Sequence, residues 1–175
     1  MSQFSIWIIP QGSVSDTITS LTKKIADDFG SPVFQTHITL IPDVVGEAED
    51  NIKNVEEITK QTEAFSVSFN GVGLQWEMYF QCLYLTVRQD LQLMQLRENL
   101  VKKFTPHNRS LYMPHLSIMY GDNVPVETKS DIIGEIEDSL INTSYTVDSL
   151  YIYQTNNPVS SWRFIKKLPL VHKQQ

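Results

Sequence analysis

Two successive runs of alternating strand-like and helix-like segments most restrict the folds open to this 175-residue chain. In the first half, short apolar stretches alternate with amphipathic helical stretches in the order β-α-β-α-β, and the second half follows the order β-α-β-α-β-β. Such alternation is typical of helices that pack on the outside of β-sheets. The sequence therefore predicts an α+β protein made of two related β/α halves.

Capping, terminating and turn-forming residues mark the ends of the expected segments in the first half. Asp16 is expected to cap the first helix, whose apolar residues recur every three or four positions, and Gly30 is expected to end it. The other expected segments are an apolar strand over 4–9, an extended stretch over 33–41, a surface helix over 47–63, and an alternating strand over 65–69 followed by an Asn70-Gly71 turn.

The second half predicts the same kinds of segment. We expect strands over 78–87, 112–120, 143–153 and 161–168, a helix that Asp90 caps, and a helix over 127–140. No low-complexity linker separates the halves. The expected organisation is one bilobal domain over 1–175, with antiparallel sheets lining a central cleft and helices outside. Its approximate lobes are 1–73 and 78–175, between which strands can be exchanged.

The charge of the chain disfavours one class of function. With 14 Lys and Arg against 20 Asp and Glu, the formal net charge is −6. Proteins that bind nucleic acid non-specifically neutralise phosphates with basic residues, so a small ligand fits this chain better than a long polyanion. Most of the negative charge precedes residue 88, and an anion site is therefore expected to depend on the second half.

The location of the protein is also constrained by the sequence. A single cysteine, Cys82, excludes a disulfide within the chain and favours a reducing compartment. The first residues lack the basic and long apolar regions of a signal peptide, and no apolar run approaches the roughly 20 residues of a membrane span. We expect a cytoplasmic monomer with no membrane partner.

Two of the four histidines lie in closely similar strings, Thr36-His37-Ile38-Thr39-Leu40 and Pro114-His115-Leu116-Ser117-Ile118. In an extended strand, residues i and i+2 project from the same face. Each string therefore places an imidazole and a hydroxyl side by side on a sheet. If both strands line one cleft, two imidazoles and two hydroxyls meet there.

This set of side chains suits phosphodiester hydrolysis. One histidine can take a proton from the attacking water while the other protonates the leaving oxygen, because both forms of imidazole are accessible near neutral pH. Thr39 and Ser117 can bind the phosphoryl oxygens. The two histidines have no neighbouring cluster of cysteines or carboxylates, so no metal site is predicted.

The two motifs resemble those of the two-histidine (2H) phosphoesterases, and the chain is most similar to the eukaryotic-type cyclic phosphodiesterases. Further similar segments are Phe4-Ser5-Ile6-Trp7, Ser31-Pro32-Val33-Phe34, Tyr79-Phe80-Gln81-Cys82-Leu83-Tyr84 and Tyr120-Gly121. The resemblance implies a bilobal fold that opens nucleoside 2′,3′-cyclic phosphates and ADP-ribose 1″,2″-cyclic phosphate without a metal or other cofactor. The second of these substrates is produced by tRNA splicing.

The resemblance also implies roles for single residues. His37 and His115 become the acid/base pair, in an order that the sequence leaves open, and Thr39 and Ser117 become phosphate ligands. Tyr120 corresponds to a tyrosine near the phosphate, which requires the second strand to end or bulge near Met119. Trp7 corresponds to an aromatic residue that borders the substrate, although its apolar surroundings are also typical of a core residue.

Two other functions remain open from the sequence. The protein can act on RNA ends or 2′,5′ linkages, which the missing basic groove disfavours. It can also be a non-catalytic module that binds a nucleotide or cyclic phosphate through the same four side chains. Turnover of a 2′,3′-cyclic nucleotide distinguishes the module from an enzyme, and a rise of activity with oligonucleotide length indicates an RNA substrate. No stable nucleic-acid partner is expected.

Overall fold

The computed structural model describes the chain apart from residues 1, 76–77, 105–110, 122–123, 157 and 173–175. Its helices are α1 (Gly12–Phe29), α2 (Ala48–Thr59), α3 (Leu91–Phe104) and α4 (Val126–Leu140), with a short 3-10 helix over Val159–Ser161. The strands are β1 (Gln3–Ile8), β2 (Ile38–Val45), β3 (Phe65–Leu74), β4 (Leu83–Val87), β5 (His115–Met119), β6 (Ser144–Val147), β7 (Ser149–Gln154) and β8 (Arg163–Pro169).

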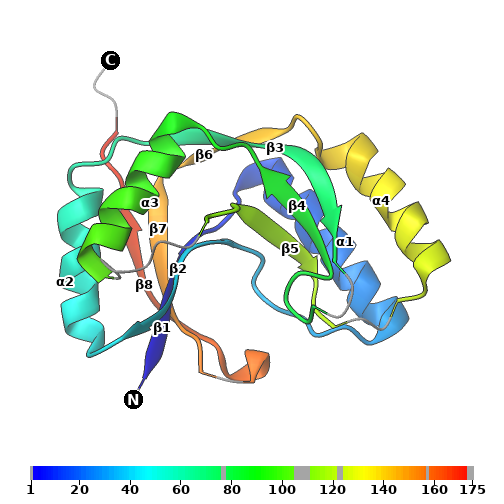
Figure 1. The fold of residues 1–175 in the computed structure, drawn as a ribbon, viewed down its shortest axis with the longest axis horizontal. Helices are drawn as coiled ribbons and strands as arrows, with labels where there is room; N and C mark the ends of the chain where they lie inside the picture. The colour runs from blue at the N-terminus through cyan, green and yellow to red at the C-terminus, as the bar shows by residue number, and fades with distance from the viewer. Residues whose placement is uncertain (1, 76–77, 105–110, 122–123, 157, 173–175) are drawn as a thin grey trace.

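The eight strands form one antiparallel sheet in the order β6-β3-β4-β5-β2-β1-β7-β8. Only Asp148 separates β6, at one edge, from β7, near the other edge. Just before β3, the Ala64 N–H also donates to the Val171 carbonyl beyond β8, at 2.8 Å. The two ends of the sheet must therefore approach each other, and the sheet curls into the open arc seen in Figure 1. The predicted α+β class is confirmed.

One narrow junction joins the two halves of this sheet. The strands β6-β3-β4-β5 form one group and β2-β1-β7-β8 form the other, and the pairing between them consists of Ile38 opposite Leu116. Both side chains are completely buried. Strands from the two halves of the sequence are mixed in each group, since β3 lies between β6 and β4, and β7 follows β1.

The helices pack in two pairs, one on each group of strands. Contacts join α2 and α3 to each other and to β8 and β2, while α1 and α4 contact β5 and β3 (Figure 1). Each helix buries an apolar stripe, such as Ile18, Leu21 and Ile25 of α1, as the sequence spacing predicts. The four described α-helices thus contact the strands as two pairs, α2 with α3 and α1 with α4.

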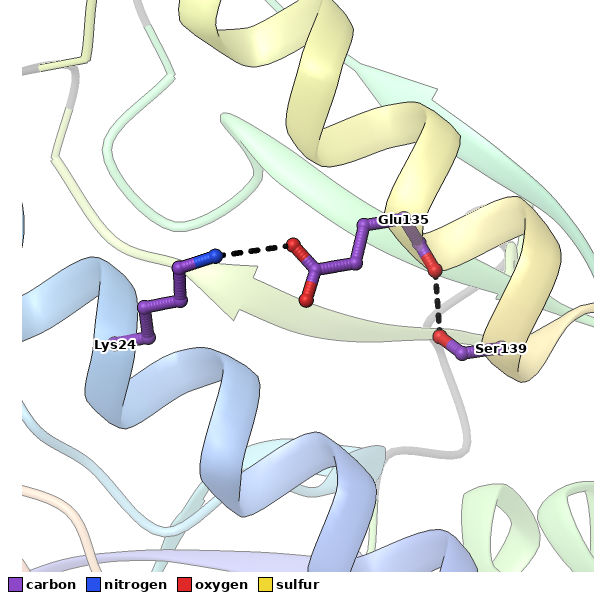
Figure 2. Close-up of polar contacts among 3 residues, drawn as sticks. All are labelled: Lys24, Glu135 and Ser139. Carbon is purple, nitrogen blue, oxygen red and sulfur yellow. Dashed lines mark hydrogen bonds and ion pairs between the residues drawn. The ribbon is translucent and has the colours of Figure 1, made fainter.

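A polar contact also links α1 to α4. The Lys24 ammonium lies 3.3 Å from a carboxylate oxygen of Glu135, and the Ser139 hydroxyl donates to the Glu135 backbone carbonyl (Figure 2). Both charged side chains are more than half exposed, and such pairs contribute about 0–1 kcal/mol. The helix pair is therefore held chiefly by its apolar contacts.

Two strand predictions are wrong because of long-range pairing. The stretch expected as one strand over 143–153 is two strands, since β6 pairs with β3 whereas β7 pairs with β1. The turn expected at Asn70-Gly71 is a register irregularity inside β3, which continues to Leu74 along β4. In both cases a distant strand determines the local conformation.

Several element boundaries also differ from the predictions. The strand expected over 33–41 is Ile38–Val45, because the residues before Ile38 pair with no described strand and those after Ile41 pair with β1. Helix α1 begins at Gly12, so Asp16 is not its cap, although Gly30 ends the helix with a left-handed φ of 69° as expected. Strand β4 begins at Leu83 rather than at residue 78.

We predict that Gly73→Ala destabilises the fold by about 1–3 kcal/mol. A methyl group at this position in β3 would overlap the ring of Tyr84, which is nearly buried and packs edge-on against His115 at 5.4 Å. Urea unfolding measures the effect. The matched control is Gly134→Ala in α4, where the added methyl meets no atom within 4 Å and helix propensity predicts stabilisation by about 0.5–1 kcal/mol. Equal stabilities of the two variants would contradict the clash.

Candidate functional site

A cavity of about 260 Å³ opens on the inner side of the curled sheet, where the two groups of strands meet. All six residues singled out from the sequence line it: Trp7, His37, Thr39, His115, Ser117 and Tyr120. The other lining residues are Gln3, Ser5, Pro42, Asp43, Phe80, Thr155 and Trp162.

The junction between β2 and β5 brings the two histidine motifs together. Because the strands are antiparallel and Ile38 lies opposite Leu116, the same register places His37 opposite Ser117 and Thr39 opposite His115. Directly opposed residues in such a pair have Cβ atoms about 4.5–5.5 Å apart. Each imidazole therefore lies across from the hydroxyl residue of the other motif as well as beside its own.

The two imidazoles are anchored in the same way. The Nδ1–H of His37 donates to the Gln35 carbonyl at 2.6 Å, and the Nδ1–H of His115 donates to the Met113 carbonyl at 2.9 Å. A carbonyl only accepts hydrogen bonds, so these contacts fix the proton of the neutral ring on Nδ1. In both residues Nε2 therefore carries the lone pair of the neutral ring and is the atom that can accept a proton.

The surroundings of His37 keep its ring uncharged. The ring stacks on Trp7, with centroids 3.5 Å apart and planes 10° from parallel, and only 7% of the residue is exposed. Burial lowers the pKa of His37 to about 4, against the opposing effect of the bond to the Gln35 carbonyl, and the nearby His115 lowers it further. At neutral pH, His37 is therefore a neutral proton acceptor.

His115 is more accessible and has a second polar partner. Its Nε2 lies 3.1 Å from the side-chain nitrogen of Gln81, which is in the segment that leads into β4. With the carboxamide in this orientation, the Gln81 N–H donates to the lone pair of the neutral ring. Rotated by half a turn, the same carboxamide offers its oxygen to a protonated ring. Gln81 can thus bind His115 in either charge state.

The hydroxyl of Ser117 connects the same segment to Tyr120. It donates to the Phe80 carbonyl at 2.6 Å, and it also shares a hydrogen bond with the Tyr120 side chain. Burial raises the pKa of Tyr120 more than this bond lowers it, so the phenol stays protonated. Strand β5 ends at Met119, and Gly121 has a φ of 77°, which lets Tyr120 reach the cavity as the sequence analysis required.

The other two predicted residues have different surroundings. Thr39 is partly exposed in the cavity, and its backbone carbonyl accepts a bond from Tyr112 at 2.9 Å. Trp7 is only 1% exposed, because His37 covers one face of its ring and Tyr153 stacks on it at 4.2 Å. Its indole N–H donates to Ser5. Trp7 therefore offers the cavity a ring edge rather than a free face.

The sequence reasoning about the site missed the seven other lining residues and Gln81, of which Asp43, Phe80, Gln81 and Trp162 bear most on its chemistry. Asp43 lies in an irregularity of the β1–β2 pairing and has a left-handed φ of 54°. Phe80 and Gln81 were noted only as part of a similar segment, and Trp162 falls within the strand expected over 161–168. No local spacing links them to the histidines, since the curled sheet brings them there.

Two features are absent from the part of the chain that the structure describes. No group of three or more His, Cys, Asp or Glu side chains is arranged to hold a metal ion in this part of the chain. Among the helices described, none is both long and apolar enough to cross a membrane.

The chain is similar to known proteins over almost its whole length. A family model described as cyclic phosphodiesterase-like protein matches residues 1–174. A cyclic phosphodiesterase of Arabidopsis thaliana is 23% identical over 155 residues, which cover 87% of this chain and 85% of the relative. The sequence resemblance to this family is thereby confirmed.

Solved structures share the fold. LigT of E. coli in complex with 3′-AMP superposes with a TM-score of 0.64 at 17% identity, covering 97% of this chain and 98% of LigT. TT0787 of Thermus thermophilus gives a TM-score of 0.65 at 13% identity, covering 98% of this chain and all of the other. The architecture is that of the two-histidine phosphoesterases.

The burial of His37 predicts a pH-dependent stability. Its pKa is lower in the folded state than the usual 6.5, so the unfolded chain binds the proton more tightly and acid favours unfolding. We expect a contribution that is fully present above pH 6.5 and is lost as the pH falls towards 4, about 2–3 kcal/mol between pH 7 and 4.5. Urea unfolding of the wild type and His37→Gln at both pH values isolates it. The same pH dependence in both proteins would show that His37 is not desolvated.

Proposed function

Because the chain belongs to the family of cyclic phosphodiesterase-like proteins, we propose that it hydrolyses small cyclic phosphate esters to phosphomonoesters. Family membership, the Arabidopsis relative and the shared fold support a hydrolase of the phosphoesterase type. The proposed substrates are nucleoside 2′,3′-cyclic phosphates, ADP-ribose 1″,2″-cyclic phosphate, or both. The second substrate would connect the enzyme to tRNA splicing in the cytoplasm.

One observation carries this proposal above all. Two His-x-hydroxyl motifs from distant parts of the chain line the same cavity, with each imidazole across the β2–β5 junction from the opposite hydroxyl residue. A binding module for a cyclic phosphate needs hydrogen-bond donors but does not need two proton-transfer groups anchored through Nδ1. The paired anchoring therefore favours an enzyme.

In the proposed reaction, the oxygen of a water molecule attacks phosphorus while one histidine Nε2 takes its proton. The bond from phosphorus to one ring oxygen breaks, and the other histidine gives that ribose oxygen a proton. The product is a phosphomonoester beside a free hydroxyl, so the reaction balances without a cofactor. Thr39 and Ser117 bind the non-bridging oxygens, where negative charge increases in the transition state.

The different surroundings of the two histidines support an order for their roles. The lowered pKa of about 4 keeps His37 unprotonated at neutral pH, so its ring is available to accept the proton of water. His115 then delivers the proton to the leaving oxygen, and its partial exposure allows it to be recharged from solvent. Trp7 acts through His37 as a positioning residue, because its ring covers one face of the imidazole.

The hydrogen bonds of the 80–81 segment imply a rearrangement on substrate binding. Ser117 donates its only proton to the Phe80 carbonyl, and Gln81 occupies Nε2 of His115. To bind a phosphoryl oxygen, the Ser117 hydroxyl must rotate away from that carbonyl. The substrate must likewise displace Gln81 from Nε2, after which the carboxamide can donate to the phosphate. Gln81 is thus a positioning residue for His115.

The proposed function predicts that the wild type converts a 2′,3′-cyclic nucleotide to one phosphomonoester isomer. His37→Ala and His115→Ala should each lower kcat/KM by several orders of magnitude, since each removes a proton-transfer group. EDTA should leave the rate unchanged. A panel of cyclic mononucleotides, ADP-ribose cyclic phosphate and short RNA, followed by chromatography, measures substrate choice.

The same measurements distinguish the proposed function from a binding module and from an enzyme that acts on RNA. Near wild-type activity in either alanine variant would contradict the two-histidine mechanism, and loss of activity with EDTA would contradict the metal-free reaction. A bound but unhydrolysed nucleotide would indicate a binding module. Activity that rises with oligonucleotide length would indicate an RNA substrate. His172→Ala is a suitable control because His172 does not line the cavity.

Gln81 gives a separate prediction. Gln81→Ala should lower kcat/KM about tenfold, because the free enzyme loses the bond that orients Nε2 of His115 and the bound substrate loses a donor to the phosphate. In Gln81→Glu, the carboxylate stabilises the protonated ring of His115, so the alkaline limb of the pH–rate profile should move to higher pH. Gln92→Ala on α3, outside the cavity, is the matched control. An unshifted profile in Gln81→Glu would rule out the contact with His115.

A further inference from the structure

The cavity extends along β1 and β2, away from the two histidines. Gln3, Ser5 and Trp7 alternate along β1 and all line the cavity, so one face of this strand forms a wall of it. At one end of this wall, Trp7 stacks on His37 and lies opposite Thr39 of β2. The strand runs about 13 Å from Trp7 to Gln3. The sugar of a bound cyclic phosphate therefore has room to lie along this wall.

A bulge in β2 brings a carboxylate into the cavity. The register between β1 and β2 leaves Ser5 opposite two residues, Pro42 and Asp43. In a regular strand only one of two successive residues faces a given side, but both of these line the cavity. Asp43 has a left-handed φ of 54°, which Asp and Asn tolerate better than most other residues. The irregular backbone thus directs the Asp43 side chain towards the cavity.

Asp43 lies about one sugar ring from the proposed phosphate site. It is opposite Ser5, two residues along β1 from Trp7. Because Thr39 lies opposite Trp7, about 7 Å along the strands separates Asp43 from Thr39. None of the ion pairs between described residues includes Asp43, and the described lining contains no Lys or Arg. A second anionic group in the cavity would therefore meet this carboxylate without a compensating basic side chain from those residues.

The basic residues of β8 are too distant to cancel the charge of Asp43. Arg163 begins β8, which is three strands from β2 in the sheet order. Adjacent strands are about 4.8 Å apart, so about 14 Å of sheet separates these two strands. The Debye length at physiological ionic strength is about 8 Å, so salt screens charges at that separation more strongly than charges about 7 Å apart. The carboxylate of Asp43 therefore determines the sign of the charge in its part of the cavity.

The candidate substrates differ in charge at one position of the ribose. In a nucleoside 2′,3′-cyclic phosphate, the 5′ position carries an uncharged hydroxyl. In ADP-ribose 1″,2″-cyclic phosphate the corresponding position carries a diphosphate, and at an RNA end it carries the phosphate of the preceding nucleotide. One sugar ring thus separates the added charge from the cyclic phosphate. The charge of the cyclic phosphate itself is common to all three substrates and cancels from their comparison.

We propose that Asp43 selects substrates whose ribose carries no phosphate at the 5′ position. This inference rests on the proposed function and narrows its substrates to nucleoside 2′,3′-cyclic phosphates. A 5′ phosphate that lies in the cavity with the ribose is within about one Debye length of the carboxylate, and the two negative charges repel each other. An uncharged 5′ hydroxyl is not repelled, and it can donate a hydrogen bond to the carboxylate.

The test compares adenosine 2′,3′-cyclic phosphate with its 5′-phosphorylated derivative, which differs from it by one phosphate. Because Asp43 is exposed, solvent weakens the repulsion, and the wild type should favour the unphosphorylated compound about 3- to 10-fold in kcat/KM at low ionic strength. Asp43→Asn removes the charge and keeps a residue that tolerates the left-handed φ, so the ratio should fall to within about twofold. In the wild type, about 1 M salt should reduce the ratio in the same way.

The matched control is Asp16→Asn, which removes an equal charge from an exposed position on α1 that does not line the cavity. It should leave the ratio unchanged. A wild type that hydrolyses both compounds equally at low ionic strength would overturn the proposal. An equal loss of kcat/KM on both compounds in Asp43→Asn would also overturn it, because Asp43 would then only support the bulge.

Binding separates this proposal from the proposed function. Calorimetry with adenosine 2′-monophosphate and adenosine 2′,5′-bisphosphate needs no turnover. If the wild type hydrolyses neither cyclic phosphate but binds the monophosphate more tightly, and Asp43→Asn removes that difference, selection by Asp43 stands and the catalytic proposal fails. If hydrolysis is observed and Asp43→Asn leaves the preference intact in both binding and kcat/KM, selection by Asp43 fails and the catalytic proposal stands.

Discussion

The pairing of Ile38 with Leu116 is the contact on which the arrangement of the site depends. It joins β2 to β5, and thus the two groups of four strands, and it places each histidine across from the hydroxyl residue of the other motif. Both residues are fully buried between the polar positions that flank them. A shift of one residue in this register would turn the imidazole of the strand that moves towards the core and separate the two histidines onto opposite faces. The same apolar residues that stabilise the junction therefore fix the geometry of the cavity.

The two histidine motifs are nearly symmetric, but their surroundings differ. Both rings donate from Nδ1 to a carbonyl two residues earlier, but His37 is sealed against Trp7, whereas His115 remains partly exposed beside Gln81. Desolvation favours the neutral form of the first ring, whereas the second ring is partly open to solvent. A duplicated motif thus supplies two unlike groups, which is what a reaction with one proton acceptor and one proton donor requires.

The sequence was most informative where local pattern and tertiary structure agree. Alternation predicted that His37 and Thr39 share a face, and apolar spacing predicted the four helices. The division of residues 143–153 at Asp148 was missed because it depends on which distant strand each piece pairs with. Gln81 and Trp162 were missed as site residues for the same reason. The curl of the sheet brings these two residues to the cavity, and no spacing along the chain predicts that curl.

The charges that line the cavity, like the net charge of −6, restrict which anions the protein can bind. Among the described lining residues there is no Lys or Arg, and Asp43 is present. Under the proposed reaction, the substrate is a phosphodiester with one negative charge, whereas the product is a monoester whose second ionisation, with a pKa near 6, adds another. In that reaction one histidine is protonated before and after the proton transfers, so this ring and the uncharged donors can bind the single charge. The second charge gains no further cation among the described lining residues, and it lies in a cavity that also holds the Asp43 carboxylate. Under the proposed reaction, the cavity therefore favours the cyclic ester over its product.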